Sequence, residues 1–107
     1  MNPKFVKIVV YVPSSHAKKI REVLAESGAG RIGKYDYCSF TVKGTGRFRA
    51  LKGAKPFIGK IGVIEKVVEE RIETICPRKI LKKVLAAVKK AHPYQEPAVD
   101  IYPLLDK

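Results

Sequence analysis

The fold of this chain is decided by its first apolar stretch, Phe5-Val6-Lys7-Ile8-Val9-Val10-Tyr11-Val12. Successive side chains of a strand point to opposite faces, and in this stretch both alternating sets are largely apolar. The pattern therefore predicts a strand over residues 5–12 that is buried on both sides, as a central strand of a sheet is. Pro13 ends this strand because proline lacks the backbone N–H that a sheet ladder needs.

Residues 14–27 follow with apolar side chains at helical spacing, which predicts a first helix that ends at Gly28 and Gly30. The spacing Gly28-x-Gly30-x-x-Gly33 also matches the fingerprint of a dinucleotide-binding loop. That fingerprint requires a strand before the glycines and a helix after them, so that the helix N-terminus faces the phosphates. The order here is reversed, and we interpret these glycines as a helix cap and a turn.

The rest of the chain completes the order βαββαβ. Alternation predicts a second strand over residues 35–42 and a third over residues 63–75, joined by a glycine-rich connection over residues 44–62. Pro77 suits the first turn of a helix, and an apolar stripe opposite lysines predicts that helix over residues 78–91. A fourth strand is expected over residues 98–104. Residues 1–107 would thus form one α+β domain of ferredoxin-like fold, with a four-stranded antiparallel sheet and two helices on one face.

The sheet face without helices is predicted to be apolar. It would carry Val9, Tyr11, Tyr35 and Tyr37 if the alternation holds. An apolar surface of this kind is typically covered by a partner or by another copy of the chain.

Composition limits the classes of function. The 107 residues contain two cysteines, Cys38 and Cys76, outside any C-x-x-C spacing. Neither a zinc ribbon nor a redox dithiol is indicated, and two buried reduced thiols are expected. No apolar run is long enough to span a membrane and no export pattern begins the chain, so we expect a cytoplasmic protein without membrane contact.

The formal net charge is +12, and the basic residues gather in helix 78–91 and in the glycine-rich connection. No acidic residue accompanies the six cations of residues 43–60, which are Lys43, Arg47, Arg49, Lys52, Lys55 and Lys60. The third strand instead holds four glutamates, Glu65, Glu69, Glu70 and Glu73. RNA-recognition modules share the βαββαβ order but place basic and aromatic residues on that strand, so the glutamates disfavour a nucleic-acid partner.

The two histidines suggest a metal site as one alternative. His16 begins the first helix and His92 follows the end of the second. Imidazole and carboxylate groups are suitable ligands for a divalent metal, and His16, His92 and Glu96 would converge if the first and fourth strands approached each other. The other alternative is structural, with each ring bonded to a carbonyl group or capping a helix. No nucleophile lies beside a base, so no catalytic residue is assigned and an enzyme is not expected.

Motifs along nearly the whole chain resemble the PII-like (CutA-like) domain of the YqfO branch of Nif-three-like proteins. They occur in order as Tyr11-Val12-Pro13 with His16, Gly28-Ala29-Gly30, Ile32-Gly33-Lys34-Tyr35, Cys38-Ser39-Phe40, Gly44-Thr45-Gly46-Arg47-Phe48, Gly53-Ala54-Lys55-Pro56 with Gly59, Arg71-Ile72-Glu73, and His92 to Leu104. The chain departs from the family pattern at four positions, Ala50, Lys52, Gln95 and Val99. Two of these, Lys52 and Gln95, stand where the family has carboxylates, which makes the connection more basic and weakens the case for a carboxylate-based metal site.

The resemblance implies a homotrimer that binds or regulates rather than catalyses. In PII-type trimers, the connection between strands two and three contacts regulated partners, and small anionic ligands bind at clefts between subunits. The residues that match this connection are Arg47, Arg49, Lys52 and Lys55, which suit a small anion or an acidic protein surface. The alternative is that the connection only completes the trimer.

The CutA-like character implies the alternative, a divalent-metal-binding protein that uses His16, His92 and Glu96. A divalent metal is the sole cofactor that the sequence suggests. Larger relatives carry this domain inserted in a metal-binding scaffold, whereas we expect this chain to stand alone, without the scaffold and its metal ligands.

Overall fold

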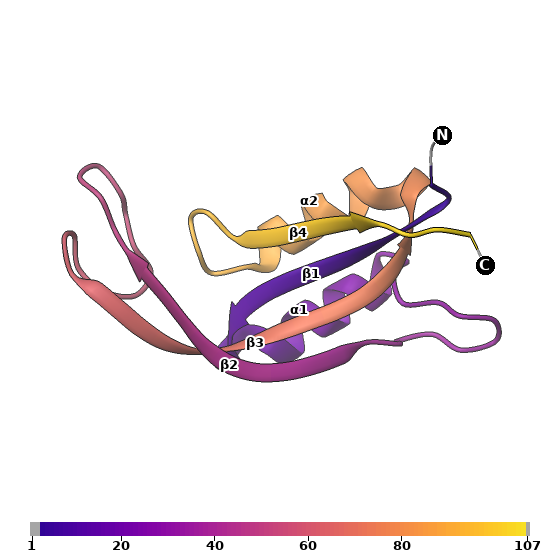
Figure 1. Cartoon of the computed structure of the whole chain (residues 1–107), viewed down its shortest axis with the longest axis horizontal. Coiled ribbons are helices and arrows are strands. Elements are labelled where there is room, and N and C mark those ends of the chain that lie inside the picture. Colours follow the sequence, from indigo (N-terminus) through magenta and orange to yellow (C-terminus); the bar gives the residue numbers. More distant parts are fainter. Residues whose placement is uncertain (1–2, 107) are drawn as a thin grey trace.

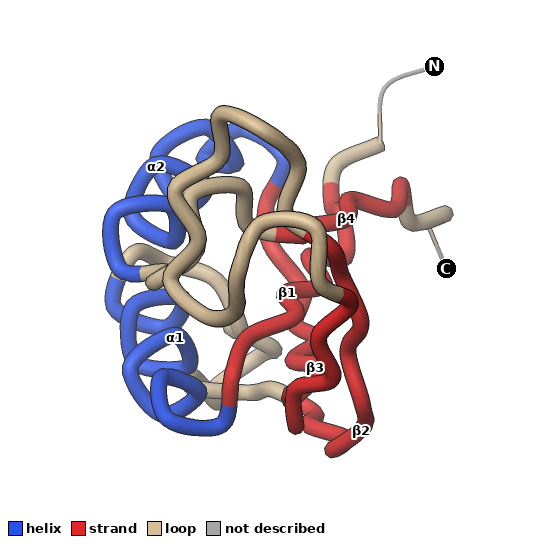
Figure 2. The backbone as a smooth tube through the Cα atoms, turned by 90° about the vertical axis from the view of Figure 1, so that its left-hand side faces the viewer, coloured by secondary structure: helices blue, strands red, loops and turns tan. Residues whose placement is uncertain are grey.

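The computed structural model describes residues 3–106. The elements are β1 (Phe5–Pro13), α1 (Ser14–Glu26), β2 (Phe40–Arg49), β3 (Ile64–Pro77), the short 3-10 helix η1 (Arg78–Ile80), α2 (Leu81–Ala91) and β4 (Ala98–Pro103). The strands form one antiparallel sheet in the order β2-β3-β1-β4. Both helices lie in a layer on one face of this sheet (Figure 2). The predicted α+β fold of ferredoxin-like topology is thereby confirmed. Among residues 3–106, no helix combines the length and the apolar character that a membrane span requires.

The hydrophobic core lies between β1 and the two helices. The core-facing side chains of β1, from Val6 to Val12, are at most 3% exposed, and Val9 on the opposite face is fully buried as well. Ile20 of α1 and Val84 of α2 pack against them. Burying an aliphatic side chain of this size contributes roughly 1.5–3 kcal/mol, so β1 is the strand on which most of the core depends. Its predicted central position is confirmed.

The second strand was predicted too early in the chain. It begins at Phe40 and not at residue 35, because residues 31–39 leave the sheet in a loop of their own. Tyr37 in this loop has a left-handed φ of 56°, which a strand cannot contain. The loop is fastened at its base, where the Cys38 N–H donates to Gly30 O (2.9 Å) and the Thr74 hydroxyl donates to Cys38 O (2.7 Å).

Three expectations fail with this shift. Tyr35 and Tyr37 lie in the loop and not on the open sheet face. Cys38 is half-buried in the same loop, whereas Cys76 is fully buried as predicted. The connection predicted over residues 44–62 is shorter, since β2 continues through two glycines and pairs with β3 up to Arg49 and Ile64.

The far ends of β2 and β3 and residues 50–63 between them project beyond the helices as an arm (Figure 1). Gly46 leaves room for the Glu69 side chain on β3, which a Cβ atom at this position would displace. Apolar side chains on the arm are exposed, with Val68 at 61% and Ile64 at 66%. The sheet therefore extends past the core that its helices cover.

The open face of the sheet is mixed rather than apolar. Phe40 and Val42 of β2 are 65% and 48% exposed. Toward the centre, Lys7 and Arg71 form ion pairs with Glu73 at 3.3 Å and 3.7 Å. The open face thus has an apolar edge beside a charged centre.

Gly30 and Gly33 provide a matched test of the loop's base. Both have left-handed φ values, +77° and +57°, but a Cβ at Gly30 would lie 2.7 Å from Cys38 O, whereas one at Gly33 meets nothing within 4 Å. We expect Gly33→Ala to lower the free energy of unfolding by about 1 kcal/mol and Gly30→Ala by about 2–4 kcal/mol, because steric overlap adds to backbone strain. Urea unfolding at one protein concentration measures both, and equal losses would contradict this packing.

Candidate functional site

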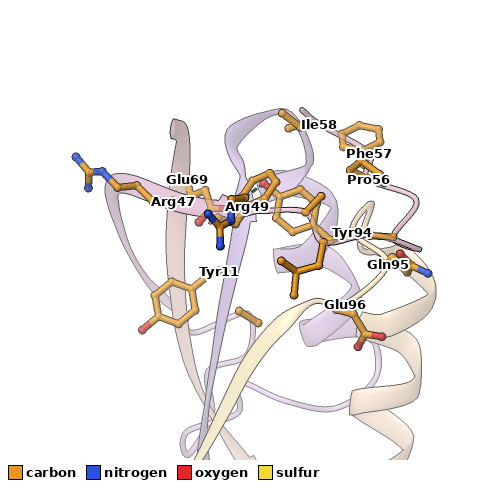
Figure 3. A pocket seen from close by; sticks show the side chains of 15 residues that line it. Tyr11, Arg47, Arg49, Pro56, Phe57, Ile58, Glu69, Tyr94, Gln95 and Glu96 are labelled. Atoms are coloured by element: carbon orange, nitrogen blue, oxygen red, sulfur yellow. Dashed lines mark hydrogen bonds between the residues drawn. The ribbon is translucent and has the colours of Figure 1, made fainter. Parts of the chain in front are cut away.

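A cavity of ≈ 430 Å³ lies where the arm meets the turn between α2 and β4 (Figure 3). We call it the loop–turn cavity. Its walls come from the end of β2, residues 50–58, Glu69 and residues 94–98, with Tyr11 of β1 alongside. The fold thereby brings the glycine-rich basic segment and the proline-rich terminal motif into one site.

His92 holds the turn against the end of β1. Its Nε2 lies 2.8 Å from Tyr11 O, and its Nδ1 lies 3.1 Å from the Tyr94 backbone N. Because the Tyr94 N–H must donate to Nδ1, the proton is assigned to Nε2, which donates to Tyr11 O. Burial lowers the pKa of His92, so its ring is held neutral with both nitrogens engaged.

Tyr94 links the turn to the arm. Its hydroxyl donates to Glu69 Oε2 at 2.9 Å, and its ring lies 5.7 Å from Phe48 and 6.4 Å from Phe57. Burial raises the pKa of Tyr94, and the bond to Glu69 raises it further. His16 of α1 completes this cluster, with its ring edge-on to Phe57 at 5.6 Å.

Gln95 joins the turn to the long loop of the arm. Its Oε1 accepts a hydrogen bond of 3.0 Å from the Lys55 backbone N–H. The amide oxygen thus does what a carboxylate oxygen would do at this position, without adding a negative charge.

The predicted basic residues are placed unequally. Arg47 and Arg49 line the cavity, but they belong to β2 and not to a connection. Lys55 contacts the turn through its backbone, and Lys52 is exposed and does not line the cavity. Within residues 3–106, neither arginine forms a salt bridge.

The three residues suggested for a metal do not form a metal centre. Both ring nitrogens of His92 are engaged, and His16 Nδ1 lies 2.9 Å from Ser15 Oγ. Glu96 is exposed at the rim of the cavity. Across the part of the chain that the structure describes, no three His, Cys, Asp or Glu side chains gather where they could hold an ion. The structure therefore does not bring these three residues together, and the hydrogen bonds of His92 are those of the structural alternative.

Sequence reasoning missed the aromatic part of the site. Phe48, Phe57 and Tyr94 meet at the cavity, although 37 residues separate Phe57 from Tyr94 in the chain. The available signal was weak, because the glycine-rich segment and the terminal motif each contain only two widely spaced aromatic residues.

No family model matches the chain, but several known proteins are similar to it. A GTP cyclohydrolase 1 type 2 homolog of Halalkalibacterium halodurans is 52% identical over 101 residues, covering 94% of this chain and 27% of that protein. A protein of the same name from Bacillus subtilis is 48% identical over 98 residues, covering 92% of this chain and 26% of its own length. The crystal structure of a Bacillus cereus protein related to NIF3 superposes with a TM-score of 0.84 at 42% identity, over 99% of this chain and 27% of that one.

The chain matches a part of each of these proteins. The family resemblance predicted from the motifs is thereby confirmed, and the chain spans about a quarter of the length of these relatives. The CutA protein of Archaeoglobus fulgidus superposes with a TM-score of 0.70 over 96% of this chain and 86% of its own. Its identity is 20%, so it supports the fold alone.

Removing the Tyr94 hydroxyl tests the link between turn and arm. We expect Tyr94→Phe to lower the free energy of unfolding by about 1–2 kcal/mol, because the Glu69 carboxylate loses a donor in a partly buried site. Tyr35→Phe is the matched control, since Tyr35 is 76% exposed and its loss of a hydroxyl should change little. Equal effects of the two substitutions in urea unfolding would show that the Tyr94–Glu69 bond contributes nothing.

The buried ring of His92 makes stability depend on pH. Its pKa is lowered in the folded protein, whereas the unfolded chain takes up a proton near the ordinary value of about 6.5. The stabilising contribution is therefore complete above pH ~6.5 and is lost as the pH falls through the folded-state pKa. His92→Gln should remove this part of the pH dependence between pH 7 and 5, measured as the difference in unfolding free energy from the parent protein. An unchanged pH profile in the variant would contradict a neutral buried ring.

Proposed function

We propose that this chain is a homotrimeric module that binds a small ligand or a partner protein at the loop–turn cavity and acts by regulation, not by catalysis. The observation that carries the proposal is the cavity itself, with two arginines on an otherwise mostly apolar wall. Pockets of this kind, apolar with a few fixed polar groups, are the usual form of a small-molecule site.

The contacts around the cavity support a link between ligand binding and the position of the arm. Three side-chain interactions hold it together: Tyr94 with Glu69, Gln95 with the Lys55 backbone, and the ring contacts of Phe57. A ligand in the cavity would contact both the arm and the turn. Occupancy would therefore stabilise one placement of residues 50–63, which is how a binding module passes information to a partner.

Exposed apolar side chains support assembly. Phe40 and Val42 leave an apolar edge on the open sheet face, and Ile64 and Val68 leave another on the arm. Exposed apolar side chains that lie next to one another are stabilised when a second copy of the chain covers them. A trimer is the assembly that the resemblance to PII-like domains implies, and the CutA likeness of the fold is in keeping with it.

Native mass spectrometry tests the assembly. We expect the purified protein at micromolar concentration to appear at three chain masses. Phe40→Lys should shift it toward one chain mass, because a lysine at this 65% exposed position would place a charge in the interface. Ala86→Lys on the exposed surface of α2 is the control and should leave the trimer intact. A parent protein of one chain mass would contradict the proposal, and so would an unchanged assembly in Phe40→Lys.

A further inference from the structure

We propose that the loop–turn cavity takes a small aromatic monocarboxylate, a flat ring system that carries a single negative charge. This inference rests on the proposed function and names the class of ligand for the same site. It follows from three properties of the cavity: the rings in its walls, the balance of charge around it, and its size.

Aromatic side chains form much of the wall. Phe48, Phe57 and Tyr94 form a connected cluster in this wall. Tyr11 lines the cavity too, with its ring apart from Phe57 and Tyr94 (Figure 3). Aromatic rings prefer offset-stacked or edge-to-face neighbours, and such pairs gain energy beyond the area that they bury. A flat ring therefore fits this wall better than an aliphatic chain of the same volume.

Arg49 supplies the positive group. Figure 3 places Arg49 among the aromatic side chains, whereas the guanidinium of Arg47 extends away from them. Neither arginine forms a salt bridge with another residue between 3 and 106. A guanidinium binds a carboxylate through two parallel hydrogen bonds, which makes a carboxylate the matching anion. Gln95 does not add a donor beside Arg49, because its oxygen is bonded to the Lys55 backbone and Figure 3 shows its amide group turned away from Arg49.

The charge balance favours one negative charge over two. Two carboxylates, Glu69 and Glu96, line the cavity together with the two arginines, so its formal charge is zero. A dianion such as a phosphate group would add two negative charges to a partly apolar site that already holds two carboxylates, and repulsion between charges is stronger there than in water. A monocarboxylate leaves a smaller excess of negative charge. The volume of ≈ 430 Å³ lies toward the small end of ligand sites and suits one or two fused rings.

Isothermal titration calorimetry with 1-naphthoate as the probe tests this assignment. We expect saturable binding of one naphthoate per chain, and binding at least about tenfold weaker for the uncharged 1-naphthalenemethanol, because one charge-assisted hydrogen bond is worth about that factor. Arg49→Gln should weaken naphthoate binding about tenfold or more, and Arg47→Gln less. Lys52→Gln is the matched control, because it removes one exposed charge outside the cavity and should leave the affinity unchanged.

Four results would overturn the inference. Equal affinity for naphthoate and the alcohol would show that the carboxylate charge plays no role. Equal losses of naphthoate affinity in Arg49→Gln and Lys52→Gln would show that the basic surface attracts the anion in general and that Arg49 does not bind it specifically. Tighter binding of adenosine monophosphate than of naphthoate would mean that the cavity binds ligands of another class. The proposed function would then stand, and the aromatic monocarboxylate would be the wrong ligand. If neither compound binds in a manner that depends on Arg49, the cavity is not the proposed ligand site, and the proposed function is contradicted as well.

Discussion

The burial of the core-facing side chains of β1, from Val6 to Val12, is the constraint on which the rest of this structure depends. These side chains fix the two helices, and the backbone of β1 pairs with β3 on one side and β4 on the other. At its end the strand accepts one further hydrogen bond, from the buried His92 ring to Tyr11 O. The turn before β4 is therefore positioned by the same strand that organises the core. Because this turn forms one wall of the loop–turn cavity, that wall is held rigidly.

The other wall is of a different kind. The arm carries exposed apolar side chains beyond the helices, and a few side-chain contacts hold it to the turn. Elements with few buried contacts open at lower free energy than a core strand does. The cavity thus joins a rigid wall to an adjustable one, an arrangement that suits a module whose arm responds to what the cavity holds.

Sequence periodicity was sufficient to locate β1, β4 and both helices, because the apolar side chains of each element recur with the period of a strand or of a helix. It failed to locate β2 for two reasons. Residues 35–39 alternate like a strand although Tyr37 has a left-handed φ, and the glycines at 44 and 46 are typical of a loop although they pair with β3. The basic residues of the site were visible in the sequence. The contacts of Tyr94 with Glu69 and Phe48 were not, because they depend on how the arm folds back toward the turn and no local pattern records that.

The central claim is that the arm and the turn enclose a site for a flat anion. A crystal structure of the protein grown with 1-naphthoate tests it most directly. We expect the carboxylate to bind the Arg49 guanidinium and the rings to pack against Phe48, Phe57 and Tyr94, with the Tyr94–Glu69 hydrogen bond intact. Naphthoate on the lysines of α2, or a cavity filled by side chains of a neighbouring subunit in the trimer, would contradict it.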